Sequence, residues 1–261
     1  MRGEYCVYGA TLLSLFSAIM LVFANISQLS PGAVTSGLFF AEVNCKGLGT
    51  AYDVAGGGSG GLTTGDPKAA LGQGIGSRQY YRYGVYGACG YLPNGGTCNA
   101  TSFGYPFDPS GQIGADITTD RGMRGTLFGL LGGDQAITDS VYNMTLSRAA
   151  NLLIFLGTVM CGIALVVGIF KTRITFLVAT IMSGGSALFL MVGAAMWSAI
   201  VARNAPIATR MLTETNTVGV TVTAGAALYL VWVGFVSQTL SVIPYVISFL
   251  TFRRQNGKAY E

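Results

Sequence analysis

The chain has no histidine, and only 10% of its 261 residues are charged. Without histidine it lacks the most common general base and any Ser-His-Asp or Cys-His catalytic pairing. A metal site is not expected either, because none of the five cysteines forms a CxxC pair and no imidazole is present to complete a ligand set. The residues therefore give no support for an enzyme, and we expect no cofactor.

Charge is also missing from the long hydrophobic segments. Four of them contain enough apolar residues, about 20, to cross a hydrocarbon core of about 30 Å. None of the four contains Asp, Glu, Lys or Arg, which disfavours a proton or ion carrier, because such pathways usually need ionisable groups inside the helix bundle. A mainly α membrane protein with a four-transmembrane-helix bundle is predicted, with spans at residues 8–28, 149–170, 174–201 and 224–250.

Basic residues near the span ends indicate the orientation. Lys171 and Arg173 lie between the second and third spans, and the tail 253–261 carries three more cations. Since Lys and Arg favour the cytoplasmic side, both termini are expected inside, with loop one (30–148) and loop two (202–223) extracellular.

The first span has one alternative interpretation. Val22-Phe23-Ala24 resembles a signal-peptide cleavage site. The apolar run is longer than the usual signal core of about 7–15 residues, so retention as a membrane anchor is favoured.

Loop one is nearly neutral. Residues 30–148 contain eight acidic and seven basic side chains. No basic stripe is present, so a nucleic-acid partner is not expected.

One segment of loop one is rich in glycine. Residues 48–76 have few large apolar side chains, so we predict a mobile surface segment. Gly56, Gly58 and Gly61 match a GxGxxG pattern, but a dinucleotide site needs a strand before it and a helix after it. We interpret the match as accidental.

Several polar-loop segments have the composition of strands. Residues 37–43 and the tyrosine-rich residues 79–86 are predicted strands, and residues 97–107 are the expected partner of 79–86 across a turn. Residues 218–223 alternate valine with small or polar residues. An alternation with period two is typical of a strand, so these residues could form a fifth strand. An extended start of the last span is an equally supported alternative. A small extracellular antiparallel β-sheet is therefore expected.

Cysteine positions predict one disulfide. Cys89 and Cys98 would lie on either side of a hairpin end, which makes a bridge between them sterically reasonable. Cys45 is then either free or paired between chains. Cys6, beside the inner interface, is a candidate for palmitoylation, with an unmodified cysteine as the alternative. Asn99 begins the sequon in the body of loop one and is a candidate for N-glycosylation.

The third span carries small residues at multiples of four positions. Ser183, Ala187, Ala195 and Ala199 are predicted to form a helix-packing face inside the bundle, with a dimer interface as the alternative. Trp197 is expected in the outer aromatic belt.

A short signature in loop one resembles the first extracellular segment of the claudin superfamily. Its order is glycine, aliphatic, aromatic, two spacers, cysteine and a second cysteine, followed by an arginine at the start of the second span. Tyr86 stands where claudins have tryptophan. The residues that carry the resemblance are Gly84, Val85, Tyr86, Cys89, Cys98 and Arg148.

Residues 38–40, 193–199 and 219–225 are similar to the fungal SUR/PalI family of tetraspans. This resemblance implies a plasma-membrane protein of eisosome-like cortical domains that supports membrane and cell-wall organisation without catalysis. The implied partners are membrane lipids, other integral plasma-membrane proteins and the cell wall, with a homo-oligomer left open. The alternatives are an accessory subunit or regulator of a transporter, pump or calcium-influx system, and a PalI-like component of ambient-pH signalling.

Overall fold

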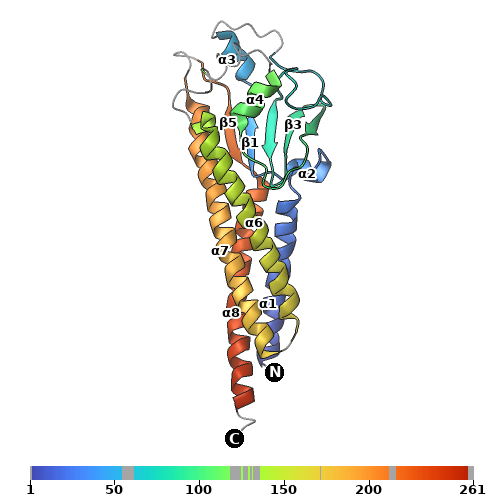
Figure 1. Ribbon diagram of the computed structural model, residues 1–261, viewed down its shortest axis with the longest axis vertical. Coiled ribbons are helices and arrows are strands. Elements are labelled where there is room, and N and C mark those ends of the chain that lie inside the picture. The colour runs from blue at the N-terminus through green and yellow to red at the C-terminus, as the bar shows by residue number, and fades with distance from the viewer. Residues whose placement is uncertain are drawn as a thin grey trace. The chain divides into compact units, whose positions relative to one another are not determined.

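The computed structural model describes residues 2–54, 62–117, 136–170, 172–211 and 216–257, together with three isolated positions, 125, 129 and 131 (Figure 1). The chain divides into two compact units. The helical unit comprises residues 1–24, 152–195 and 229–261. The sheet unit comprises residues 25–151 and 196–228.

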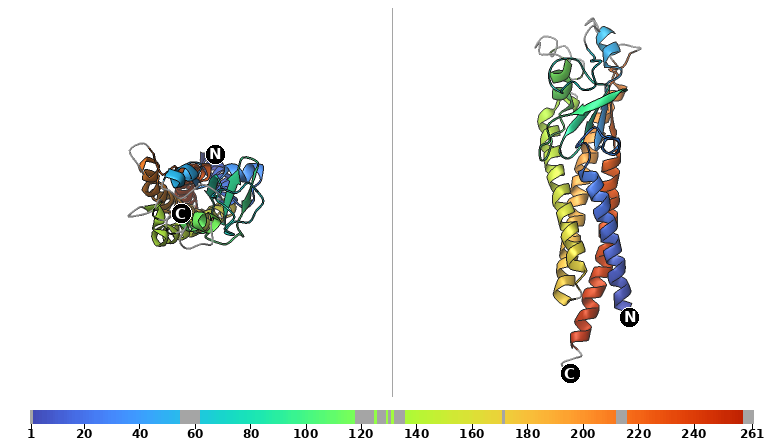
Figure 2. Two further views of the ribbon diagram at one scale, coloured as in Figure 1. Left: turned by 90° about the horizontal axis from the view of Figure 1, so that it is seen from above. Right: turned by 90° about the vertical axis from the view of Figure 1, so that its right-hand side faces the viewer.

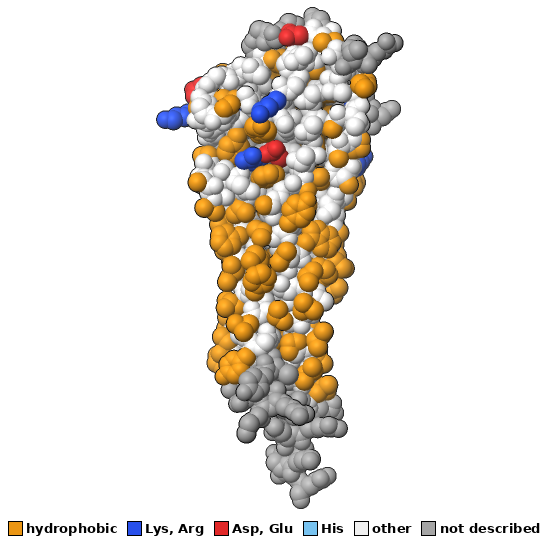
Figure 3. Space-filling view, turned by 180° about the vertical axis from the view of Figure 1, so that it is seen from behind, with side chains coloured by type: hydrophobic (Ala, Val, Ile, Leu, Met, Phe, Trp, Pro, Cys, Tyr) orange, Lys and Arg blue, Asp and Glu red, His pale blue; other side chains and the backbone are white. Residues whose placement is uncertain are grey.

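Four long apolar helices are present in the described residues, and they confirm a mainly α membrane protein with four candidate spans. In the helical unit they run side by side (Figures 1 and 2). Figure 3 shows many hydrophobic side chains on the visible face of this unit, as expected for contact with lipid tails. The helices are α1 (Arg2–Asn25), α6 (Ser140–Gly168), α7 (Arg173–Asn204) and α8 (Ala226–Gly257).

Helix α6 begins before the predicted span start at residue 149, because its first turn is capped by a polar side chain. The backbone N–H of Tyr142 donates to Oδ1 of Asp139 at 3.1 Å. A side-chain oxygen at this position satisfies one of the unpaired N–H groups of the first turn. The polar residues 140–148 therefore extend the helix beyond its apolar part.

Buried polar side chains join the helices of the helical unit. Ser186 donates to the carbonyl of Gly157 at 2.7 Å, and the amide of Gln238 donates to Ser183 at 3.0 Å. Gln238 and both serines are buried. Lipid tails are as apolar as the helices, so the hydrophobic effect does not drive membrane helices together. Interhelical hydrogen bonds of this kind help to hold them together instead.

The predicted packing face of α7 is only half correct. Ser183 and Ala187 are buried, whereas Ala195 and Ala199 are exposed. Steps of four residues overshoot the helical repeat of 3.6, so after 16 residues the last member has rotated by about 160° to the opposite side. The buried stripe continues instead through Leu190, Ala194 and Trp197.

The sheet unit contains five antiparallel strands in the order β4-β3-β2-β1-β5. They are β1 (Ala41–Asn44), β2 (Tyr80–Tyr83), β3 (Ala88–Leu92), β4 (Gly95–Cys98) and β5 (Thr221–Ala224). Strand β5 pairs with β1, which selects the strand interpretation of the segment before the last span. Short helices complete the unit: α2 (Ala33–Gly37), α3 (Leu48–Val54), α4 (Pro109–Ile117), η1 (Ala136–Thr138) and η2 (Ala205–Thr209).

The partner of β2 differs from the prediction. Strand β2 pairs with β3, and of the expected partner 97–107 only Thr97 and Cys98 are in a strand, as the end of β4. The chain reverses early because Gly84 donates its N–H to the carbonyl of Gly87 at 2.8 Å. This tight turn ends β2 and lets the next residues return beside it.

The glycine-rich segment lies at the surface over residues 63–75, as predicted, but it is anchored by buried side chains at several points where it is described. Leu48, Tyr52 and Leu62 are buried. Residues 55–61, which hold the GxGxxG match, lie outside the described residues. Hydrogen bonds hold this segment in place where apolar side chains are few. The buried guanidinium of Arg78 donates to the carbonyls of Asp66 and Ala69.

Glycine is required where loop one meets loop two. A Cβ on Gly47 would lie 2.6 Å from Cα of Gly219, and Gly219 has a φ of +70°. The N–H of Gly47 donates to the carbonyl of Gly219 at 3.1 Å. Only residues without a side chain allow the two backbones to approach this closely.

Candidate functional site

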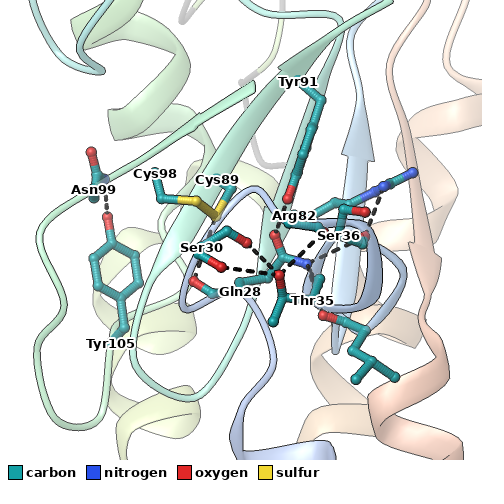
Figure 4. Close-up of a disulfide and its surroundings, with 12 residues drawn as sticks. Gln28, Ser30, Thr35, Ser36, Arg82, Cys89, Tyr91, Cys98, Asn99 and Tyr105 are labelled. Atoms are coloured by element: carbon teal, nitrogen blue, oxygen red, sulfur yellow. Dashed lines mark hydrogen bonds between the residues drawn. A yellow bond between two sulfur atoms is a disulfide. The ribbon is translucent and has the colours of Figure 1, made fainter. Parts of the chain in front are cut away.

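The predicted disulfide is present in the sheet unit. Cys89 on β3 and Cys98 on β4 are directly opposite each other, with their Cα atoms 3.9 Å apart, and their sulfur atoms are bonded (Figure 4). Cys89 is fully buried. The bridge therefore joins the edge strand β4 to its neighbour β3 within one hairpin.

Replacing both cysteines, Cys89→Ser with Cys98→Ser, should destabilise the sheet unit by about 2.5–3 kcal/mol, because a loop of about ten residues is no longer closed in the unfolded chain. Thermal unfolding of the purified protein measures the loss. Reduction with dithiothreitol should lower the melting temperature of the parent and leave the double variant unchanged. Recovery of both residues as free thiols in non-reducing peptide mapping would contradict the bridge.

The signature residues before the disulfide form a turn that packs on the segment after α1. A Cβ on Gly84 would lie 2.9 Å from Cβ of Gln28, so only glycine fits. Val85 is fully buried. Tyr86 is partly exposed beside Phe103, with their ring centroids 6.1 Å apart. Each position of the signature thus has a distinct packing role.

Gln28 organises this region, a role that was not predicted from the sequence. Its side chain is fully buried, and its backbone adopts a φ of +55°. The amide nitrogen donates to the carbonyls of Thr35 and Leu38, both at 2.7 Å, while the amide oxygen accepts from the hydroxyl of Tyr91 at 3.0 Å (Figure 4). One side chain therefore ties the end of α1 to α2 and to β3.

Asn151 and Trp197 form a second buried centre. The indole N–H of Trp197 donates to Oδ1 of Asn151 at 2.9 Å, and the amide of Asn151 donates to the carbonyl of Tyr105 at 3.0 Å. The indole also packs against Phe40 and Phe107, at centroid distances of 5.2 and 5.9 Å. The predicted place of Trp197 in an aromatic belt is therefore wrong, because the residue is fully buried.

The other predicted site residues are dispersed. Arg148 lies on the exposed side of α6, and no contact of its side chain is seen among the described residues. The side chain of Cys6 lies outside the described part of the chain. Cys45 is almost completely buried and unpaired, which argues against a disulfide between chains. Burial also raises the pKa of its thiol well above the usual range.

Asn99 lines a polar pocket between β2, α4 and α6 rather than projecting freely. Its amide nitrogen donates to the hydroxyl of Tyr105 and, at 2.9 Å, to the side-chain oxygen of Gln112. Figure 4 shows the amide and the phenol facing each other beside the disulfide. A glycan on this nitrogen would replace one of its two N–H groups, so at least one of these bonds would be lost. The pocket has a volume of about 330 Å³ and includes Tyr83 and Asp108 in its wall.

A buried carboxylate lies behind this pocket. Asp116 accepts hydrogen bonds from the hydroxyl of Tyr81 at 2.7 Å and from the amide of Gln112 at 3.2 Å. Desolvation raises the pKa of Asp116, although these bonds and the charge of Arg78 act in the opposite direction. Among the described residues, no group of three His, Cys, Asp or Glu side chains is arranged to hold a metal ion.

Four apolar helices that could span a membrane, a five-stranded antiparallel sheet and a cross-strand disulfide after a glycine-aromatic turn define a claudin-like four-span membrane protein. The model of the SUR7/PalI family matches residues 6–258, and the chain belongs to this family. No curated protein matches the sequence.

Proposed function

We propose that this chain is a non-enzymatic organiser of fungal plasma-membrane domains at the cell cortex, of the eisosome-like kind, and that it supports membrane and cell-wall organisation. The observation that carries the proposal is the family match over nearly the whole chain. Both termini are cytoplasmic in this proposal, and the sheet unit faces the cell wall. The basic residues of the 171–173 turn and of the tail support this orientation.

The protein acts through lateral contacts with lipids and other membrane proteins, and not through catalytic turnover. Large apolar side chains are exposed along all four helices, where they can contact lipid tails or the spans of other membrane proteins. In the sheet unit, Arg82 forms an ion pair with Glu42 at 2.6 Å and lies over the rings of Phe39 and Tyr91. This polar and aromatic sheet surface is suited to contacts outside the bilayer.

Live-cell imaging of the protein with a fluorescent C-terminal tag tests the function. We expect stable patches at the cell cortex whose fluorescence recovers slowly after bleaching, because lateral contacts hold the protein in place. A tagged single-span protein of the same membrane serves as the control and should recover quickly. An impermeant antibody against the C-terminal tag should bind only after the cells are permeabilised.

Two outcomes would contradict the proposal. Uniform, rapidly recovering fluorescence would remove the organising role. Labelling of the C-terminal tag in intact cells would overturn the orientation. Localisation to endomembranes, or to a transport complex that loses activity when this protein is deleted, would instead favour an accessory subunit.

A further inference from the structure

The polar pocket of the sheet unit is an open hollow whose wall carries several unused hydrogen-bonding groups. Its volume of about 330 Å³ is at the lower end of the ~300–1,000 Å³ typical of small-molecule sites. Strand β2, helix α4, the loop before α4 and helix α6 all contribute to its wall. The lining residues that matter here are Tyr83, Asn99, Tyr105, Asp108, Gln112 and Met144.

Tyr83 gives the clearest sign that the pocket is built for a ligand. The residue is 1% exposed, and its hydroxyl has no hydrogen-bond partner among the described residues. Leaving a buried hydroxyl unpaired costs about 1–3 kcal/mol, so such groups usually have a partner in the protein, in ordered water or in a bound molecule. Burial, with the nearby Tyr105 and Asp108, raises the pKa of this phenol, which therefore stays protonated and able to donate.

Asp108 supplies an acceptor on the same wall. Its Oδ1 accepts from the hydroxyl of Ser140 at 2.7 Å and from the N–H of Gly111 at 3.1 Å, which fixes the carboxylate at the start of α4. A Cβ at position 111 would displace this carboxylate from its place. Oδ2 accepts no hydrogen bond from the described residues, and it remains available to a ligand.

The amides of Asn99 and Gln112 complete the polar lining. Gln112 is held by Asp116 on one side, while its oxygen accepts from Asn99. The side-chain oxygen of Asn99 has no partner among the described residues. The pocket thus offers a hydroxyl donor and two free oxygen acceptors between aromatic and apolar surfaces of Tyr105 and Met144.

We propose that this pocket binds one unit of a neutral saccharide. Each sugar hydroxyl both donates and accepts hydrogen bonds, which matches the mixture of free donor and acceptors, and a sugar ring carries apolar C–H groups for the aromatic wall. Among the described residues, no lysine or arginine lines the pocket, which disfavours an anion. In the proposed orientation the pocket faces the wall polysaccharides, so the cellular meaning of the inference rests on the proposed function.

Ligand binding can be tested on the purified full chain, in a detergent without a sugar headgroup. All proteins carry Thr101→Ala, which removes the sequon so that no glycan is attached to Asn99. Glucose, mannose and N-acetylglucosamine are titrated, with saturation-transfer NMR and calorimetry as readouts. We expect at least one of the three to bind with a Kd of about 1 mM or tighter.

Tyr83→Phe is the decisive variant, because it removes only the unpartnered hydroxyl. The melting temperature without sugar should stay the same or rise, while sugar affinity should fall about five- to tenfold. Tyr86→Phe makes the same chemical change outside the pocket and should leave affinity unchanged. This assay needs no cellular localisation, so its failure is distinguishable from failure of the proposed function.

Three results would overturn the inference. One is no binding of any of the three sugars at concentrations up to about 50 mM, well above the expected Kd. Another is equal sugar affinity of the parent and Tyr83→Phe. The third is tighter binding of ethanolamine than of the sugars, since this would show that Asp108 recognises a cation.

Discussion

Trp197→Ala should destabilise the sheet unit by about 3–5 kcal/mol, the cost of removing a large side chain from a packed core. Trp197 is fully buried against Phe40 and Phe107. Its loss also leaves Oδ1 of Asn151 without the indole donor. At about 2–4 °C per kcal/mol for a chain of this size, the melting temperature of the solubilised protein should fall by about 10 °C.

Trp232→Ala is the matched control, because this second tryptophan is on α8 and only partly buried. It should lower the melting temperature by much less. Trp197→Phe keeps most of the packing and removes the hydrogen bond, so it should lie between the parent and Trp197→Ala. If both alanine variants melted at the same temperature, the buried centre at Trp197 and Asn151 would not hold the unit together.

The helices could be predicted because their signal is long and continuous. An apolar run of about 20 residues predicts a membrane-spanning helix whatever its neighbours do. The disulfide could also be predicted, because two cysteines beside a turn require only local geometry. The alternating valines before α8 pointed to β5 because an alternation is also a local pattern, although the partner strand β1 lies far away in the sequence.

Other features could not be predicted because they depend on contacts between distant segments. Gln28 is an ordinary polar residue in the sequence, and only the fold shows that it joins three backbone segments. The glycine-rich segment lacked apolar residues, yet Arg78 holds it through carbonyl contacts. Hydrogen bonds to backbone groups leave no pattern in composition, so the polar pocket could not be predicted.

Arg78→Met should also destabilise the sheet unit strongly, by about 3–5 kcal/mol, because two hydrogen bonds from a buried charged group, each worth about 1.5–3 kcal/mol, are lost. Arg78 is 1% exposed, and its guanidinium donates to the carbonyls of Asp66 and Ala69. Methionine keeps the volume but leaves both carbonyls unpaired. It also leaves Asp116 buried without the positive charge that lowers its pKa.

The loss in Arg78→Met should depend on pH in a defined direction. The pKa of Asp116 is already raised in the folded protein, and without Arg78 it should rise further. The folded state then binds the proton more tightly than the unfolded state, so stability falls as pH rises above the ordinary aspartate range. The deficit of the variant should therefore be larger at pH 7 than at pH 5.

Adding Asp116→Asn to Arg78→Met separates two causes of the lost stability. One is the loss of hydrogen bonds to the carbonyls, and the other is the loss of the positive charge near Asp116. If the orphaned carboxylate dominates, the double variant should recover part of the stability at pH 7 and lose the pH dependence. Thermal unfolding of the four proteins at both pH values forms a double-mutant cycle that isolates the coupling between the two charges. A coupling of zero would show that Arg78 acts only through the carbonyls of Asp66 and Ala69.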